Sequence, residues 1–224
     1  MTLDLIYSTA LLLALSALYE FNVRIWGSRH LAAGLAAGLI FGAISIFGMM
    51  HPANLAPGVI FDGRSVILGV TGIFAGLPAA MIAGLMAAAY RLWLGGAGAP
   101  VGVAVIATSV LFGLAMRRAL HRGWAQPKLL DFMMFGLLLH IACLGWFLLL
   151  PLQHLQKLLD TVAVPYLFVL APSTALLALL LNDLQMQRRS KEALTRSEAL
   201  RRAIIRASPD LLLVLDEDGR YLEV

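Results

Sequence analysis

Residues 31–50 read LAAGLAAGLIFGAISIFGMM, a run of twenty residues in which Ser45 carries the only polar side chain. A helix of this length spans about 30 Å, which matches the hydrocarbon layer of a bilayer. Gly34, Gly38 and Gly42 recur every four residues and therefore share one face of that helix. Small residues let the backbones of membrane helices approach closely. The stretch predicts a transmembrane helix that packs tightly against a neighbour.

The composition of the whole chain extends this prediction to a polytopic membrane protein. Of 224 residues, 60% are hydrophobic and 13% are charged, whereas about a quarter of a globular domain is charged. The mean hydropathy is +0.84. The other apolar runs are residues 3–21, 65–95, 101–116, 129–150 and 162–184. The sequence therefore predicts an all-α polytopic membrane bundle with six to seven membrane segments, and it excludes a soluble globular fold.

The basic residues indicate a membrane topology. The pI is about 9.6 and the net charge is +4, but the cations gather at the ends of apolar runs, so no nucleic-acid partner is predicted. Under the positive-inside rule, residues 117–128 and the chain from Arg188 onward are cytoplasmic. The C-terminus is therefore predicted to lie inside the cell.

The run 65–95 has two interpretations. It forms either one long helix or a helical hairpin hinged at Gly76-Leu77-Pro78. Only the hairpin brings Arg24 and Arg29 to the cytoplasmic side, so we predict the hairpin. The run 3–21 is predicted to be a retained extra helix with its N-terminus outside, because positive charges follow it instead of preceding it as in a secretory signal.

The composition changes after the last apolar run, in which Pro165 and Pro172 predict a kink. Residues 184–207 are rich in charged and polar side chains, and they contain neither glycine nor proline. Within this stretch the apolar residues Leu194, Leu200 and Ile204 recur near helical spacing. The pattern predicts a continuous helix. It is either a solvated linker or a parallel coiled coil that makes the protein a homodimer.

The final residues, 201–224, read RRAIIRASPDLLLVLDEDGRYLEV. They predict a helix end, a strand over 211–215, an Asp-Gly turn and a second strand that begins at Tyr221. This segment resembles the opening of a PAS domain. The resemblance implies a truncated PAS start over 208–224, with the remainder of the domain in a longer parent protein.

The membrane part carries two linked patterns, FGAISIFGMMHPANLAPGVIFDGRSV at 41–66 and GIFAGLPAAMIAGLMAAAYRLWLGGAGAPVG at 72–102. Together they resemble the five-transmembrane receptors of the LytS/YhcK type (5TMR-LYT). The resemblance implies a sensor domain over 30–187, an extra helix and basic loop over 1–29, and a signalling helix over 188–207. Such modules precede histidine kinases of two-component systems or diguanylate cyclases and phosphodiesterases of c-di-GMP signalling. Some members are thought to sense small carboxylates such as pyruvate.

Two arginines at the edges of apolar segments are the main candidate site. Arg64 ends the predicted loop 51–64, and Arg91 lies near the end of the run 65–95. Converging guanidinium groups need an anion, which Asp62 or a bound carboxylate could supply through bidentate contacts. Backbone N–H groups of the loop Gly95-Gly96-Ala97-Gly98 could also approach such a ligand. The hydroxyl groups of Thr108 or Ser109, one turn deeper, would complete the pocket. The predicted ligand-binding residues are Arg64, Arg91, Asp62, Gly95, Gly96, Gly98, Thr108 and Ser109.

Other interpretations of these residues stay open. Asp62 and Arg64 could instead staple a loop, and Arg91 could be an interface anchor beside Tyr90 and Trp93. For the whole chain, the alternatives to a receptor are a transporter-like binding bundle and a passive dimerising anchor. The tail favours the receptor, because a carrier needs no helix that leads into a PAS start.

The remaining polar residues predict no catalysis. His140 lies inside an apolar run with no second metal ligand at helical spacing, so we predict a hydrogen bond between helices and no metal site. Cys143 is predicted to serve packing. The chain has no Walker loop, nucleophile elbow or paired-carboxylate motif. We therefore expect a non-enzymatic sensor without a cofactor in a bacterial inner membrane, with lipid and a small anion as partners.

Overall fold

The computed structural model describes residues 30–50, 53–56, 59–61, 63–96, 98–149, 166–207, 214–215 and 221–222. Predictions for residues 3–21, Arg24, Arg29, Asp62 and Pro165 fall outside these ranges. The described elements are α2 (His30–Met50), β1 (Ala53–Ala56), β2 (Val59–Phe61), α3 (Arg64–Phe74), α4 (Gly76–Leu94), α5 (Ala99–His121), α6 (Leu129–Phe147), the π-helix η2 (Tyr166–Leu170), α8 (Ala171–Ala207), β3 (Val214–Leu215) and β4 (Tyr221–Leu222). The chain divides into two compact units, 1–182 and 183–224, and the division falls within α8.

The run 65–95 is a helical hairpin. Helix α3 ends at Phe74 and α4 begins at Gly76, whose backbone has φ +81. A positive φ is costly for residues with a Cβ, which explains glycine at this corner. The side chain of Arg117 in α5 secures the corner, because its Nη1 donates to the carbonyl oxygens of Ile73 at 2.8 Å and Phe74 at 3.2 Å. The prediction of two segments is therefore confirmed.

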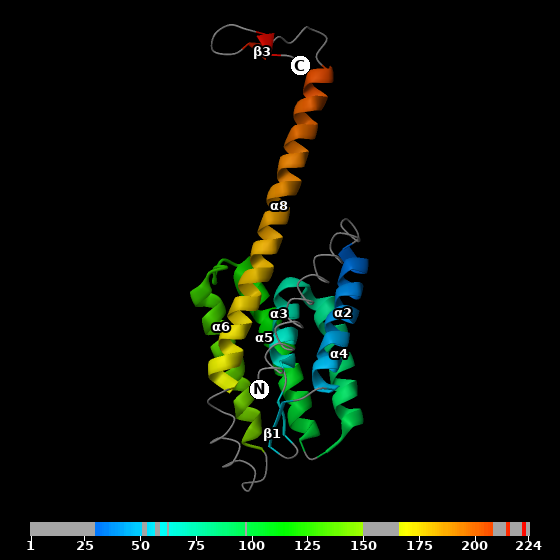
Figure 1. The fold of residues 1–224 in the computed structure, drawn as a ribbon, viewed down its shortest axis with the longest axis vertical. Coiled ribbons are helices and arrows are strands. Elements are labelled where there is room, and N and C mark those ends of the chain that lie inside the picture. Colours follow the sequence, from blue (N-terminus) through cyan, green and yellow to red (C-terminus); the bar gives the residue numbers. More distant parts are fainter. Residues whose placement is uncertain are drawn as a thin grey trace. The chain divides into compact units, whose positions relative to one another are not determined.

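Helix α3 is buried along its entire length. All eleven of its residues are buried, including the polar Arg64, Ser65 and Thr71. It packs against α5, α4, α2 and α6, which explains why it has no exposed apolar face (Figure 1). At eleven residues α3 is only about 17 Å long, too short to cross a hydrocarbon layer alone.

Glycines set the contact between α2 and α4. A Cβ on Gly38 would lie 3.0 Å from the Ala79 carbonyl oxygen, and one on Gly42 would lie 2.7 Å from Met86 Sδ. A Cβ on Gly34 would likewise lie 3.7 Å from Pro78 Cβ. Because both residue numbers rise together, the two helices run parallel. The predicted close packing along the Gly34, Gly38 and Gly42 face is confirmed.

A second glycine contact joins α3 to α5. A Cβ on Gly72 would lie 2.8 Å from the Gly113 carbonyl carbon and the Leu114 nitrogen, and one on Gly113 would overlap the Gly69 carbonyl oxygen. The two backbones therefore touch directly. This contact holds the buried α3 in register with α5.

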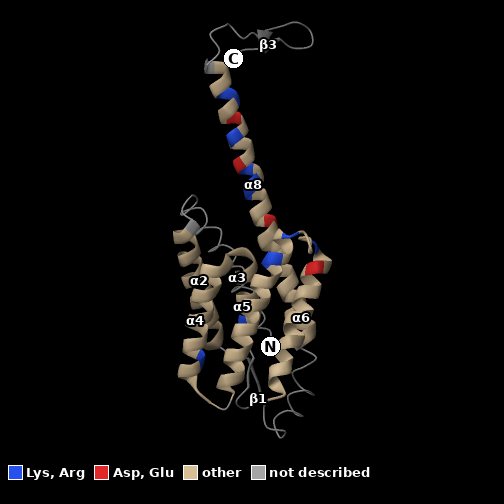
Figure 2. Ribbon diagram, turned by 180° about the vertical axis from the view of Figure 1, so that it is seen from behind, with Lys and Arg blue, Asp and Glu red and all other residues tan. Residues whose placement is uncertain are grey.

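The charged residues of α5 and α6 lie at the end of unit 1 that carries the loop between these helices (Figure 2). The apolar run of α5 was predicted to end at residue 116 and to be followed by a basic loop over 117–128, but the helix continues to His121. Arg117 lies within this helix and donates to two carbonyl oxygens of α3. At the loop, Arg122 stacks over the Trp124 ring at 4.7 Å, and the Asp131 carboxylate accepts from the Gln126 backbone N–H at 2.7 Å.

Two short strand pairs complete the described elements. Within 51–64, predicted as a loop, β1 pairs antiparallel with β2, with Ala53 opposite Phe61. The stretch between them contains Pro57-Gly58, a dipeptide typical of turns. In the second unit, β3 pairs antiparallel with β4, with Val214 opposite Leu222. This pairing agrees with the hairpin predicted from the sequence.

Candidate functional site

Arg64 is the first residue of α3, and not part of a loop as the sequence suggested. It follows the N-cap residue Gly63, and the residue as a whole is 7% exposed. Asp62, the predicted internal counter-ion, lies outside the described residues. An arginine at the start of a buried helix brings positive charge to the positive end of the helix dipole, which is an unfavourable position.

Arg91 lies in the last turn of α4 and is 3% exposed. Its Nη1 donates to the Gly95 carbonyl oxygen at 2.7 Å. The neighbouring Trp93 is 77% exposed, so the two side chains point to different surroundings. Burial of this degree does not fit the interpretation of Arg91 as a lipid-facing anchor. The residue belongs to the interior of unit 1.

The glycine loop after α4 shapes the surroundings of Arg91. Gly95 and Gly96 both have positive φ, +67 and +86, a conformation that favours glycine. The Gly95 N–H bonds to the Leu92 carbonyl oxygen at 3.0 Å, so it is the Gly95 carbonyl, not its N–H, that meets the arginine. The carbonyls of Gly96 and Gly98 accept from Ala99 and Gly102 at 3.0 and 2.9 Å. The loop thus begins α5 directly beside Arg91.

Gly102 makes room for the arginine. A Cβ at this position would lie 2.6 Å from Arg91 Nε and 3.0 Å from its Cγ and Cδ. The guanidinium of Arg91 therefore packs over the backbone of the first turn of α5. Gly102 was not among the predicted site residues, because nothing in the sequence places this turn of α5 beside Arg91.

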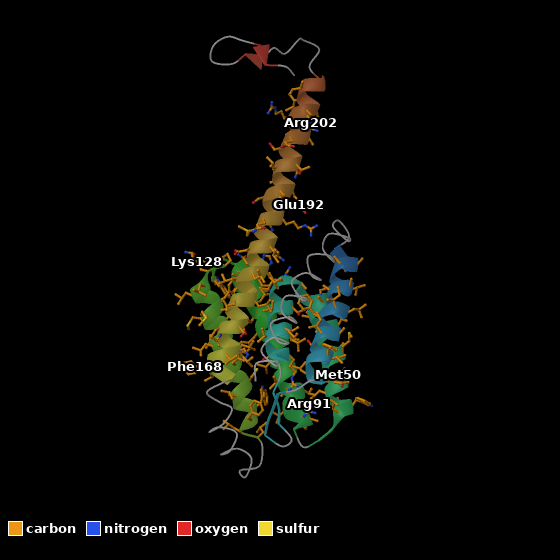
Figure 3. The ribbon with its side chains drawn as sticks, in the orientation of Figure 1. Met50, Arg91, Lys128, Phe168, Glu192 and Arg202 are labelled. Atoms are coloured by element: carbon orange, nitrogen blue, oxygen red, sulfur yellow. The ribbon has the colours of Figure 1, made fainter. Side chains whose placement is uncertain are left out.

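The two arginines lie at the same end of the α3–α4 hairpin. Counted from the corner at Ala75, Arg64 is about 17 Å along α3 and Arg91 about 24 Å along α4. Figure 3 shows Arg91 at the end of unit 1 that also holds Met50, opposite the end that holds Lys128. Along the hairpin, the two buried arginines therefore lie within about two helical turns of each other in their distance from the corner.

The two predicted hydroxyl residues contact α6. Thr108 Oγ1 accepts from Trp146 Nε1 at 2.8 Å. Ser109 is fully buried, donates to the Val105 carbonyl oxygen at 2.8 Å and lies 4.0 Å from Cys143 Sγ. Their described contacts thus hold α5 against α6, and Cys143 is buried as predicted.

His140 joins α6 to the start of α3. Its Nε2 lies 3.1 Å from Ser65 Oγ, and its Nδ1 lies 2.7 Å from the Gly136 carbonyl oxygen. The predicted hydrogen bond between helices is therefore confirmed. In the part of the chain that the structure describes, no group of three or more His, Cys, Asp or Glu side chains is placed to hold a metal ion.

The described helices define an α-helical, multi-pass membrane protein. Five are long and apolar enough to cross a bilayer, by length and composition: Leu31–Met50, Gly76–Leu94, Ala99–His121, Leu129–Phe147 and Leu167–Ile205. Residues 21–184 match the family described as 5TMR of 5TMR-LYT, so the chain belongs to the 5TMR-LYT family. These are membrane sensory domains of signalling proteins and are not themselves catalytic. The chain matches no curated protein and no solved structure.

Proposed function

We propose that residues 30–187 form a receptor for a small carboxylate, such as pyruvate, that binds at Arg64 and Arg91. The observation that carries this proposal is the burial of two guanidinium groups at one end of the α3–α4 hairpin. Arginine in the interior of a membrane protein is costly and is typical of functional sites. The full chain is proposed to relay the bound state through α8 to a PAS domain and an output enzyme, a histidine kinase or a cyclase or phosphodiesterase.

The charge of the two arginines selects an anion. Like charges in a medium of low dielectric constant repel, and an anion near both turns that repulsion into attraction. The planar guanidinium matches a carboxylate through two parallel hydrogen bonds, so a carboxylate suits this site better than a spherical ion. Asp62, which precedes Arg64 by two residues, could balance part of the charge, and Gly96 and Gly98 could contribute backbone groups.

Calorimetric titration of the purified protein tests the proposed function. Pyruvate, acetate, lactate and succinate are titrated in turn, each at the same pH and ionic strength. We expect saturable binding of at least one of the four. The absence of binding heat for all of them, in detergent and in lipid nanodiscs, would contradict a carboxylate receptor.

The proposed orientation places the arginine end outside the cytoplasm of a bacterial inner membrane. It counts α3 as a short membrane segment beside the five longer helices, and residues 3–21 as a seventh segment. The basic loop between α5 and α6 supports this orientation, because positively charged loops stay in the cytoplasm.

Cysteine labelling of intact cells checks this orientation. In a Cys143→Ala background, Asn54→Cys is expected to react with a membrane-impermeant maleimide, whereas Gln126→Cys is expected to react only after the cells are opened. The opposite pattern, with Asn54→Cys protected in intact cells, would reject the proposed topology.

The proposed homodimer forms through residues 184–207. Helix α8 includes this range, and its side chains Leu194, Leu200 and Ile204 are exposed in the single chain. A second copy could cover these apolar groups in a parallel coiled coil. Disulfide crosslinking of single-cysteine variants along 184–207 should show maxima about every 3.5 residues. A flat profile would leave residues 184–207 as a solvated linker.

A further inference from the structure

The side chains of Ser65 in α3 and His140 in α6 form a hydrogen bond between these two helices. Ser65 follows Arg64 in the chain, so the two residues cannot move independently at the backbone. Both Ser65 and His140 are fully buried. A backbone displacement at Arg64 therefore also displaces Ser65, which makes this polar contact with His140.

The imidazole of His140 is held on both sides. The Gly136 carbonyl oxygen can only accept a hydrogen bond, so Nδ1, at 2.7 Å, must donate. In the neutral ring Nε2 is then the acceptor, and the Ser65 hydroxyl at 3.1 Å donates to it. Rotating the ring away would break both bonds in a buried environment, where unmade hydrogen bonds are expensive. The ring thus ties Ser65 of α3 to α6, and its other bond fixes it to Gly136, one turn earlier in the same helix.

Gly136 touches the beginning of α8. A Cβ on Gly136 would lie 2.5 Å from the Ala171 carbonyl oxygen and 3.2 Å from Ala171 Cα. No side chain separates the two backbones, so a displacement of α6 at this point meets α8 directly. The residues just before Ala171 form the π-helix η2, and Pro172 in the first turn of α8 has no backbone N–H. A π-helical turn often marks a functional site, and it offers a segment that can tighten into α-helix.

We propose that Ser65, His140 and Gly136 couple the arginine site to the start of α8. Carboxylate binding moves Arg64 and with it Ser65, His140 passes the movement to α6, and the Gly136 contact one turn away repositions Ala171. His140 is a positioning residue in this device, and it does not touch the ligand. The coupling rests on the proposed receptor function, but its mechanical part exists with or without a ligand.

A double-mutant cycle measured without ligand tests whether the Ser65–His140 contact sets the position of α8 relative to α6. Spin labels are placed at the exposed positions Leu130 in α6 and Leu176 in α8 of the full chain, with Cys143→Ala as background. Ser65→Ala and His140→Phe are each expected to shift the distance between the labels by roughly 1–2 Å, the scale of helix displacements in such transitions. In the double variant the two shifts should not add, because both remove the same link.

Two results would overturn the coupling in this arm. One is an unchanged distance in Ser65→Ala, and the other is a full additional shift by Ser65→Ala in the His140→Phe background. His140→Gln, which can still accept from the Ser65 hydroxyl through its amide oxygen, provides a second variant should His140→Phe not fold. His121→Phe, an exposed histidine at the end of α5, is the matched control and should leave the distance unchanged.

A second arm adds pyruvate as the probe and measures binding and distance separately. In the wild type, pyruvate should bind and shift the distance; in His140→Phe it should bind within about threefold of the wild-type affinity and produce no shift. A pyruvate-dependent shift that survives in His140→Phe would refute the coupling. Failure of the wild type to bind any carboxylate would instead refute the proposed receptor, and the ligand-free cycle alone would then decide the coupling.

Discussion

Replacing Gly113 with alanine is expected to destabilise the protein by about 3 kcal/mol, the upper part of the range for overpacked sites. The new Cβ would overlap the Gly69 carbonyl oxygen and would lie 3.0 Å from Gly72 Cα. Both are backbone atoms of α3, so relief requires that α3 and α5 separate. Since α3 is buried on every side, its displacement disturbs several other contacts. Thermal or denaturant unfolding of the purified protein measures the loss.

Gly145→Ala is the matched control for this prediction. Gly145 also lies inside a helix, but a Cβ there would meet no atom within 4 Å. Alanine is a better helix former than glycine by about 1 kcal/mol, so this variant should be unchanged or slightly more stable. If Gly113→Ala were as stable as Gly145→Ala, the close contact between α3 and α5 could not be present in solution.

Part of this fold follows from the sequence alone. The apolar runs and the spacing of Gly34, Gly38 and Gly42 predicted membrane helices and one close helix contact, because length and small residues act locally. The glycine pair of α3 and α5 was not predicted. A glycine signals a close approach, but nothing in the sequence says which of several helices will approach. The extension of α5 past Arg117 was also missed. The carbonyl oxygens that accept from this arginine lie on α3, and the sequence does not show that contact.

The candidate site, like the fold, was predicted only in part. Arg64 and Arg91 stand out in the sequence because charge is rare in apolar segments, and both are buried. Gly102 and Ser65 were missed, since each is recognised only by a contact with another helix, Gly102 with Arg91 of α4 and Ser65 with His140 of α6. Thr108 and Ser109 were chosen by depth along α5. Depth does not give the rotation of the helix, and their described hydrogen bonds include partners on α6.

Arg64→Ala and Arg91→Ala are each expected to weaken carboxylate binding by about 30-fold to several thousand-fold. Removing one partner of a buried, hydrogen-bonded charge pair costs about 2–5 kcal/mol, which corresponds to that range. Lysine should not restore binding at either position, because an ammonium group lacks the planar fork of two parallel donors. Arg122→Ala is the matched control. Arg122 is exposed in the loop between α5 and α6, stacks on Trp124 and should leave the affinity unchanged.

Gly102→Ala separates the geometry of the arginine from its charge. The new Cβ would lie 2.6 Å from Arg91 Nε, so the guanidinium must move although the charge of the site stays the same. If the carboxylate is held by a positioned fork, this variant should lose at least tenfold in affinity, or about 1.4 kcal/mol. If the site acts only as a positive field, Gly102→Ala should bind as the wild type does and Arg91→Lys should retain most of the affinity. Calorimetry on variants that keep the wild-type helical content distinguishes these outcomes, and binding that survives both Arg64→Ala and Arg91→Ala would refute a shared arginine site.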